Sequence, residues 1–141
     1  MMNQQQIGRA GEHLTASYLC RYFDDVFTAS ESSRFDFLAV KDGCNYKIQV
    51  KTTNSPFVKN NSDWLRWDIR KKISNKDNEY RVYDEDEVDI FAFVCLFIDK
   101  VVFVPNKNVG KTYQKKVEFI SEIQTLETLV SSAQVVRDLK L

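Results

Sequence analysis

The chain has 141 residues, of which 43% are hydrophobic and 28% are charged, a composition ordinary for a soluble globular protein and unlike that of a disordered one. Its 20 basic residues equal its 20 acidic residues in number, so any nucleic-acid binding must come from local clusters of charge. No apolar run approaches the roughly 20 residues that span a bilayer, and the polar N-terminus lacks the apolar stretch of a secretion signal. We therefore expect one domain with no membrane segment, in the cytoplasm of a cell, or of a host if the gene is viral.

The cysteines predict no disulfide framework. Cys20, Cys44 and Cys95 lie far apart, form no C-x-x-C pair and are odd in number. We expect all three to be buried and to behave as small apolar side chains.

The chain begins with a predicted helix over residues 4 to 23. Leu14, Tyr18 and Tyr22 form an i, i+4 stripe along it. The two aspartates that follow break this pattern, and residues 26 to 28 are expected to form a short strand.

A hairpin is the clearest local prediction in the chain. Residues 35 to 40 and 46 to 53 read as strands on either side of Asp42-Gly43, a strong turn signal. The polar run at residues 30 to 33 is expected to be a loop. Because side chains alternate in a strand, the return strand divides into an apolar face and a polar face. The apolar face carries Tyr46, Ile48 and Val50, and the polar face carries Lys47, Gln49 and Lys51.

Apolar and charged side chains alternate over residues 65 to 73, which predicts a strand whose charge suits the edge of a sheet. Trp64 and Trp67 differ in parity, so at most one of them faces the core. Residues 74 to 79 are expected to form a polar loop, and residues 84 to 87 an acidic turn.

The second half of the chain also holds the most apolar strand. Residues 90 to 98 are almost wholly apolar, as expected for a central strand buried on both faces. After Asp99-Lys100 a short strand is predicted over residues 101 to 104. Loose helical patterns then predict that residues 107 to 141 form a C-terminal helical extension that binds DNA or forms an oligomer. The order of elements indicates a mixed α/β domain.

Three polar residues converge on the hairpin. Asp36 begins its first strand, and Gln49 and Lys51 lie one pleat apart on the same face of its second strand. A hairpin that pairs residues 36 to 42 with residues 45 to 51 brings Asp36 near Lys51 across the ladder. A carboxylate, a second oxygen donor and a lysine suit phosphodiester hydrolysis with Mg²⁺, which binds few protein oxygens and keeps water and phosphate as its other ligands. The lysine would orient the attacking water or stabilise charge in the transition state.

At these residues the sequence resembles the PD-(D/E)XK nuclease superfamily. The resemblance rests on Phe35-Asp36, a gap of twelve residues and Gln49-Val50-Lys51, and on Gly8-x-x-Gly11-Glu12 in the preceding helix. The runs IQVKTT and VDIFAFV…VVFVPN are similar to a branch that includes an intron homing endonuclease and the Holliday junction resolvases. The similarity covers about residues 7 to 106.

The resemblance implies a restriction-endonuclease-like α/β fold, with a central mixed β-sheet flanked by helices. It makes Asp36 the central ligand of Mg²⁺, for which Mn²⁺ could substitute, Glu12 a helix-borne ligand and Lys51 the catalytic lysine. Gln49 departs from the pattern, because most of the superfamily has Glu or Asp there. A glutamine oxygen can bind Mg²⁺ but brings no charge, although some members of this branch carry it.

Simpler interpretations stay open for several residues. Glu12 and His13 would both suit a solvated helix face, and a catalytic role for His13 is not needed by this chemistry. The acidic run at residues 84 to 87 suits a solvated turn that leaves Asp89 at the mouth of a strand, where it is a weak candidate for a ligand.

Two basic stretches are candidates for contacts with DNA phosphates. Residues 57 to 81 carry seven basic and four acidic side chains interleaved with aromatic ones, and residues 107 to 116 carry four lysines and no acid. The alternative is that these lysines only keep the surface soluble. The proposed DNA contacts are Ser33, Lys59, Arg66, Arg70, Lys71, Lys72, Lys107, Lys111, Lys115 and Lys116.

Three functions remain in competition. The first is a site-specific endonuclease of homing or restriction type, the second a resolvase that reads the shape of a DNA junction, and the third a DNA-binding or interaction module that does not cleave. The similarity of Gln49 and of IQVKTT to the intron type favours the first. Because one small domain normally needs a second copy to cut both strands, we expect a homo-oligomer, a dimer or higher.

Overall fold

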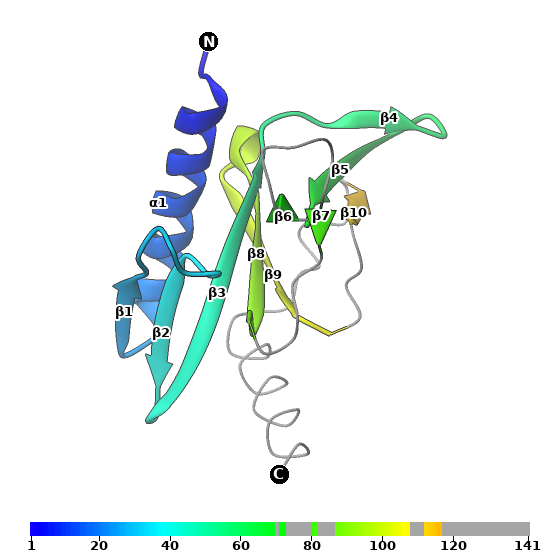
Figure 1. The fold of residues 1–141 in the computed structure, drawn as a ribbon. Coiled ribbons are helices and arrows are strands. Elements are labelled where there is room, and N and C mark those ends of the chain that lie inside the picture. The colour runs from blue at the N-terminus through cyan, green and yellow to red at the C-terminus, as the bar shows by residue number, and fades with distance from the viewer. Residues whose placement is uncertain (70, 73–79, 82–86, 108–111, 117–141) are drawn as a thin grey trace.

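The structure is a computed structural model, and the residues it describes are 1–69, 71–72, 80–81, 87–107 and 112–116 (Figure 1). The loop predicted over residues 74 to 79 and the helical patterns after residue 117 lie outside the described residues. In the described part, no helix is long and apolar enough to cross a membrane.

A five-stranded sheet forms the centre of the molecule. Its strand order is β1-β2-β3-β8-β9, and β3 and β8 form the one parallel pair in it. The bounds are Asp25–Thr28 for β1, Phe37–Lys41 for β2, Cys44–Thr53 for β3, Ile90–Cys95 for β8 and Lys100–Pro105 for β9. The sheet is therefore mixed, and the predicted hairpin is β2 and β3. Asp42 and Gly43 at its turn have φ values of 50° and 78°, as in the type I′ turns that suit two-residue hairpins.

Helix α1 (Gln4–Tyr22) covers one face of this sheet, as Figure 1 shows. Its first turn is closed by a capping box between Asn3 and Gln6, which satisfies two backbone N–H groups. The side chains that face the sheet most directly are those of Thr15 and Leu19, both fully buried. The predicted stripe of Leu14, Tyr18 and Tyr22 instead flanks this line and is only partly buried.

Helix α1 approaches β3 most closely at Gly11. A Cβ atom added there would overlap the hydroxyl oxygen of Thr52 and would lie 2.9 Å from both the Cβ and the Cγ2 of that threonine. Three atoms of one branched side chain stand in the way, so no rotation of Thr52 would clear the space. Glycine at position 11 therefore sets the distance between α1 and β3.

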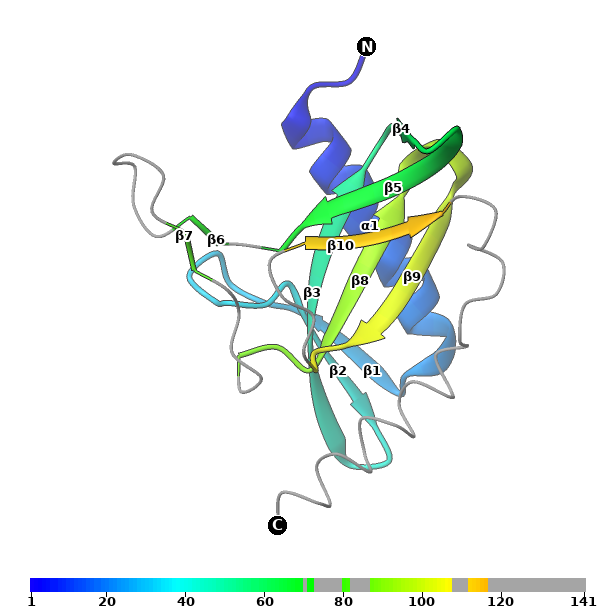
Figure 2. The ribbon, with the colours of Figure 1, turned by 90° about the vertical axis from the view of Figure 1, so that its right-hand side faces the viewer.

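The opposite face of the central sheet is covered by a second, three-stranded sheet of order β10-β5-β4, seen face-on in Figure 2. The bounds are Phe57–Lys59 for β4, Ser62–Asp68 for β5 and Thr112–Lys116 for β10. Two predictions were wrong here. The strand predicted for a sheet edge is central in its sheet, and residues 112 to 116 form a strand within the stretch predicted to be helical. Charge alternates along β5 because its outer side chains are exposed while Leu65 and Trp67 are buried, a pattern that any half-covered strand shows.

Trp67 fastens the two sheets together. Its indole Nε1 donates to the carbonyl oxygen of Val94 at 3.0 Å, and its ring lies 5.2 Å from that of Phe93 and 5.8 Å from that of Tyr113. These rings belong to the second of two hydrophobic clusters, which fills the space between the sheets. The first cluster lies between the central sheet and α1. One of the two tryptophans thus faces the core, as parity required.

Strand β8 is buried along its whole length, which confirms the predicted central strand. The apolar run continues past β8 as a 3₁₀ turn over Leu96–Ile98, so the strand ends earlier than predicted. Among the cysteines Cys95 is buried, but Cys44 is only half-buried and Cys20 is exposed. The prediction that all three are buried was therefore wrong, because Cys20 lies on the solvent side of α1.

The close approach at Gly11 predicts opposite effects for the two glycines of α1. Gly11→Ala should lower the free energy of unfolding, because overpacking costs about 1–3 kcal/mol against a helix-propensity gain of at most ~1 kcal/mol. Gly8→Ala meets nothing within 4 Å and should leave stability unchanged or raise it by up to ~1 kcal/mol. Urea unfolding of both variants measures the difference, and equal behaviour of the two would contradict this packing.

Candidate active site

Backbone hydrogen bonds hold Asp36 at the point where β2 begins. Its N–H donates to the carbonyl oxygen of Ile48 at 2.8 Å, and its side-chain Oδ2 accepts from the N–H of Val50 at 2.7 Å. The carboxylate thus takes up a backbone donor of β3 just beyond the last residue pair of the β2–β3 ladder, Phe37 with Ile48. The half-buried carboxylate lies against β3, but the register counted on from Phe37 and Ile48 places Asp36 opposite Gln49 and not, as predicted, opposite Lys51.

Strand β3 continues past Asp36 and carries the other two predicted residues. Gln49 and Lys51 are half-buried and alternate with the buried Ile48 and Val50, so they lie on the face away from α1. In the parallel pairing with β8 they stand beside Phe91 and Phe93 of the second hydrophobic cluster. The polar side chains therefore emerge from an apolar surface at the edge that β2 leaves open.

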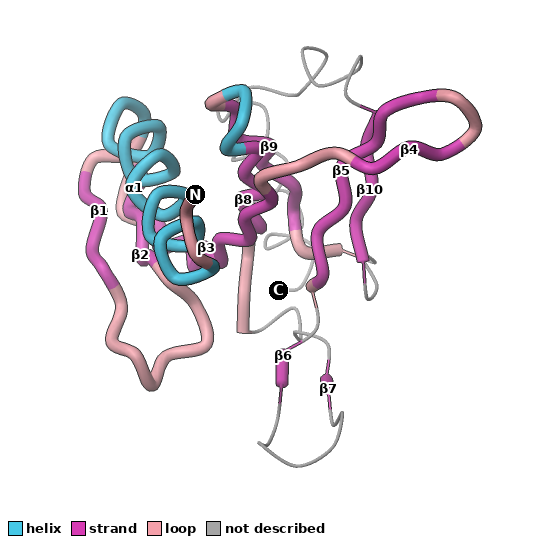
Figure 3. The backbone as a smooth tube through the Cα atoms, turned by 90° about the horizontal axis from the view of Figure 1, so that it is seen from above, coloured by secondary structure: helices cyan, strands magenta, loops and turns pink. Residues whose placement is uncertain are grey.

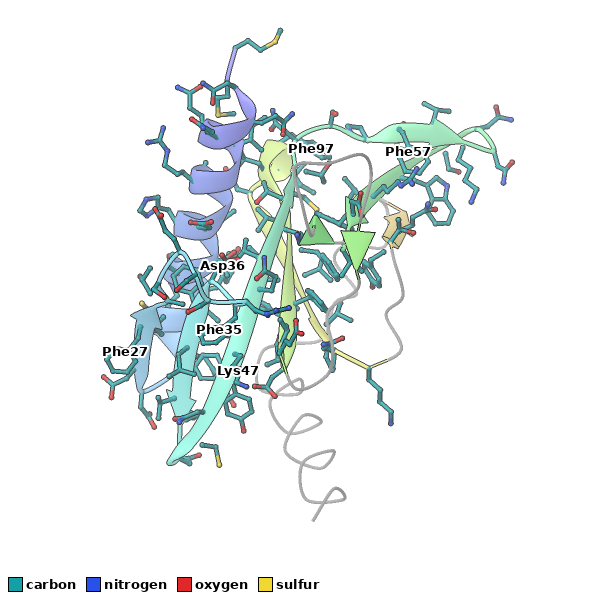
Figure 4. The ribbon with its side chains drawn as sticks, viewed as in Figure 1. Phe27, Phe35, Asp36, Lys47, Phe57 and Phe97 are labelled. Atoms are coloured by element: carbon teal, nitrogen blue, oxygen red, sulfur yellow. The ribbon has the colours of Figure 1, made fainter. Side chains whose placement is uncertain are left out.

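Glu12 approaches Asp36 from helix α1. Burial and the negative charge of Asp36 raise the pKa of the Glu12 carboxyl, and the neighbouring His13 lowers it by a smaller amount. The two carboxylates are thus close enough to repel each other. Figure 4 shows Asp36 where the β1–β2 loop meets β2, beside α1, with Lys47 farther along β3 towards the hairpin turn.

These residues suit a divalent cation. Two carboxylates that repel each other are relieved by a cation between them, and carboxylate and amide oxygens are the hard donors that Mg²⁺ prefers. Among the described residues no group of three or more His, Cys, Asp or Glu side chains could hold a metal ion. Gln49, the predicted neutral ligand, follows Ile48 in β3 on the face away from α1.

The loop from Ala29 to Asp36 leads into the site. It is closed at its base by a hydrogen bond of 2.9 Å from the N–H of Ala29 to the carbonyl oxygen of Asp36. Near its tip the hydroxyl of Ser33, a predicted DNA contact, lies 3.0 Å from that of Ser30. Arg34 forms an ion pair with Glu87 at 3.2 Å, an interaction that the sequence did not suggest. The one available signal was the position of Arg34, two residues before Asp36.

The weaker candidates have other surroundings. His13 is exposed on α1, as the solvated interpretation required. The carboxylate of Asp89 accepts from the N–H of Lys47 at 2.8 Å, and the carbonyl oxygen of Asp89 accepts from the N–H of Asn106 at 2.9 Å. Asp89 therefore ties β3, β8 and the end of β9 together. Of the acidic run only Glu87 is described, and it is paired with Arg34 rather than merely solvated.

The predicted DNA contacts separate into groups. Lys71 and Lys72 form β6 (Lys71–Lys72), which pairs with β7 (Tyr80–Arg81). Figures 2 and 3 show that this pair and the loop between β1 and β2 project on the same side of the molecule, whereas the β4–β5 hairpin projects on another. Lys59 and Arg66 belong to that hairpin and are exposed. Lys107 is exposed, Lys115 and Lys116 lie on β10, and Arg70 and Lys111 lie outside the described residues.

Residues 2–129 match the family model of the PD-(D/E)XK endonucleases. The chain belongs to this family. Its fold is similar to that of a solved bacterial homing endonuclease, I-Ssp6803I, with a TM-score of 0.66 over 81% of this chain and 78% of that one, at 12% identity. No curated protein matches the chain. The restriction-endonuclease-like fold expected from the sequence is thus confirmed, with helix α1 on one face of the mixed sheet and, in the described residues, a second sheet on the other.

The carboxyl pair predicts a pH dependence of stability in metal-free buffer. Because the pKa of Glu12 is raised above its ordinary value of 4.5, the folded protein favours the protonated carboxyl. Its contribution to stability is fully present below pH 4.5 and diminishes as the pH rises through the folded pKa. Glu12→Gln should therefore raise the thermal unfolding midpoint at neutral pH and leave it unchanged below pH 4.5. The same gain at both pH values would show that the charge of Glu12 is not the cause.

Proposed function

We propose that this endonuclease hydrolyses phosphodiester bonds of DNA with Mg²⁺, and that it cuts double-stranded DNA at specific sites as a homing or restriction enzyme does. The observation that carries the proposal is the meeting of Glu12 and Asp36 at the open edge of β3, the strand that presents Lys51. Family membership supports a nuclease, and nucleases of this family generally use divalent metal ions. The similar solved structure is that of a homing endonuclease, which favours the site-specific form.

Each residue has a separate role in this proposal. Glu12 and Asp36 hold Mg²⁺, or Mn²⁺ in its place, and the amide oxygen of Gln49 completes the protein ligands. When bound, the cation supplies positive charge that polarises the phosphate and makes a nearby water more acidic. Lys51 directs that water towards phosphorus and stabilises negative charge on the phosphate oxygens as it develops.

Gln49 makes the two carboxylates interdependent. A carboxylate at position 49 would bring a charge of its own, whereas an amide brings none. Among the described residues, the negative charge at the proposed metal site therefore comes from Asp36 and Glu12, and the loss of either one halves it. Glu12 is for this reason as necessary as Asp36, although it lies on a different element and is exposed.

The small size of the domain limits how it could cut a double-stranded substrate. A single site of this kind cuts one strand, so we propose that two or more copies of the chain act together on a duplex. A resolvase would act on a four-way junction instead, and a module without activity would bind DNA and leave it intact. The kind of DNA that is cleaved, or the absence of cleavage, distinguishes these two alternatives from the proposed function.

We expect the wild-type protein to cleave linear duplex or plasmid DNA into discrete fragments with Mg²⁺ and not with EDTA. Lys51→Ala should lower the rate by at least about 100-fold, because it removes a positioned donor that stabilises transition-state charge. Asp36→Asn and Glu12→Gln should cause nearly equal losses. Gel assays of plasmid, linear duplex and a four-way junction measure all of these.

Lys47→Ala is the matched control for Lys51→Ala, because Lys47 lies on the same face of the same strand, nearer the hairpin turn. It should retain most of the activity. If none of the three substrates is cleaved with Mg²⁺, the proposal that the protein is a nuclease is overturned. Cleavage of the junction alone would favour the resolvase. Full activity of Glu12→Gln would show that the metal site is not built as proposed.

The positions of the basic residues predict which of them bind DNA phosphates. Strand β6, which consists of Lys71 and Lys72, projects on the side of the β1–β2 loop, so the double variant Lys71→Ala/Lys72→Ala should weaken DNA binding in EDTA. The slope of log K against log salt should become shallower by about 0.9 for each phosphate that the variant no longer neutralises. Lys59→Ala/Arg66→Ala removes the same charge from the β4–β5 hairpin and should change the slope less. A larger change of the salt slope in the Lys59→Ala/Arg66→Ala variant would place the DNA on the side of the β4–β5 hairpin.

A further inference from the structure

Arg34 reaches across the strand that carries the candidate active site. It precedes β2, and its partner Glu87 precedes β8, while β3 lies between those two strands in the sheet. The ion pair of 3.2 Å must therefore cross β3. The neighbouring Phe35 packs against the second hydrophobic cluster, which lies on the face of the sheet that carries Gln49 and Lys51. Arg34 thus belongs to a segment that packs on the same face of the sheet as Gln49 and Lys51.

The surroundings of Arg34 keep it near Asp36. Two residues of chain span at most ~7 Å, and Asp36 is itself fastened to β3 by the hydrogen bonds to Ile48 and Val50. The loop is closed by the hydrogen bond between Ala29 and Asp36 and is ordered at its tip by Ser30 and Ser33. The backbone of Arg34 on such a loop therefore has a defined position close to Asp36.

The ion pair between Arg34 and Glu87 is a single contact, and its arginine is partly exposed. Nearly half of the Arg34 side chain is exposed, at 47%, whereas Glu87 is exposed to only 17%. The ion pair joins a single nitrogen, Nη1, to a single oxygen, Oε1. A guanidinium binds a phosphate best through two parallel N–H bonds, which the single contact with Glu87 does not provide. A DNA phosphate would therefore offer the guanidinium a second hydrogen bond that Glu87 does not offer.

We propose that Arg34 binds a DNA phosphate beside the cleavage site, and that Glu87 holds the guanidinium in place until the phosphate displaces it. This rests on the proposed function, since it assumes that DNA lies against β3. Before DNA binds, the pair holds the Arg34 side chain at Glu87.

The two partners of the pair should behave differently when each is replaced. DNA binding is measured in EDTA at several salt concentrations, with a duplex that the wild-type protein binds. Arg34→Ala should weaken binding about tenfold, because it removes a charge-assisted hydrogen bond to phosphate, and should make the salt slope shallower by about 0.9. Glu87→Gln removes the competing carboxylate, so binding should stay the same or become tighter with the slope unchanged.

Two further variants keep the test decisive. Arg34→Lys retains the charge but not the paired donors, so it should keep the salt slope while reducing the affinity in part. Arg21→Ala removes an exposed arginine from the last turn of α1 and should change neither quantity. Thermal unfolding of each variant shows whether it remains folded.

An unchanged salt slope in a folded Arg34→Ala protein would overturn the proposal. Equal losses of affinity in Arg34→Ala and Glu87→Gln would do the same, because they would show that the ion pair itself is needed and only supports the loop. Neither result depends on cleavage. A wild-type protein that binds DNA and cuts none would overturn the proposed function and leave the role of Arg34 in binding to be decided by the slope.

Discussion

The carboxylate of Asp36 takes the place of a strand partner for β3. By accepting from the N–H of Val50 it ends the β2–β3 ladder, and beyond it β3 runs on to Thr53 with no β2 residue beside it. Gln49 and Lys51 lie on this uncovered stretch, Glu12 approaches it from α1, and the β1–β2 loop closes onto it through Ala29. The positions of Asp36, Gln49 and Lys51 therefore follow from one side-chain hydrogen bond and the ladder that it ends.

Two close approaches hold the layers around this edge. Gly11 lets α1 lie against Thr52, which brings the next residue of the helix, Glu12, close to Asp36. On the other face Trp67 fixes the second sheet to β8 through its hydrogen bond to Val94. The electrostatic repulsion between the two carboxylates is thus imposed by packing, and a site that repels its own charges is one that a cation stabilises. Packing energy in the clusters offsets the cost of keeping the carboxylates together.

The hairpin could be predicted because its information is local. Asp42-Gly43 specifies a turn with positive φ at both positions, and the alternation of Tyr46, Ile48 and Val50 with polar residues specifies which face is buried. Once the turn is set, Asp36 must lie beside β3, although the register counted from the sequence placed it opposite Lys51 and the structure places it opposite Gln49. Strand β8 was equally plain, since only a strand covered on both faces has so apolar a run. Glu12 needed the family resemblance, because a glutamate on a helix looks the same whether it faces solvent or a site.

Long-range interactions account for what the sequence could not predict. The alternation of charged and apolar residues in β5 indicated a half-covered strand but could not show whether that strand had one neighbour or two. Residues 112 to 116 form a strand only because β5 offers them a partner. Arg34 and Glu87 are 53 positions apart, and nothing in either segment indicates the other. The sequence by itself determined the hairpin, the buried strand and the residue types at the candidate site. Only the tertiary structure decided which helix face meets the sheet and what Arg34 reaches, because these depend on how separate elements pack and not on the period of any one of them.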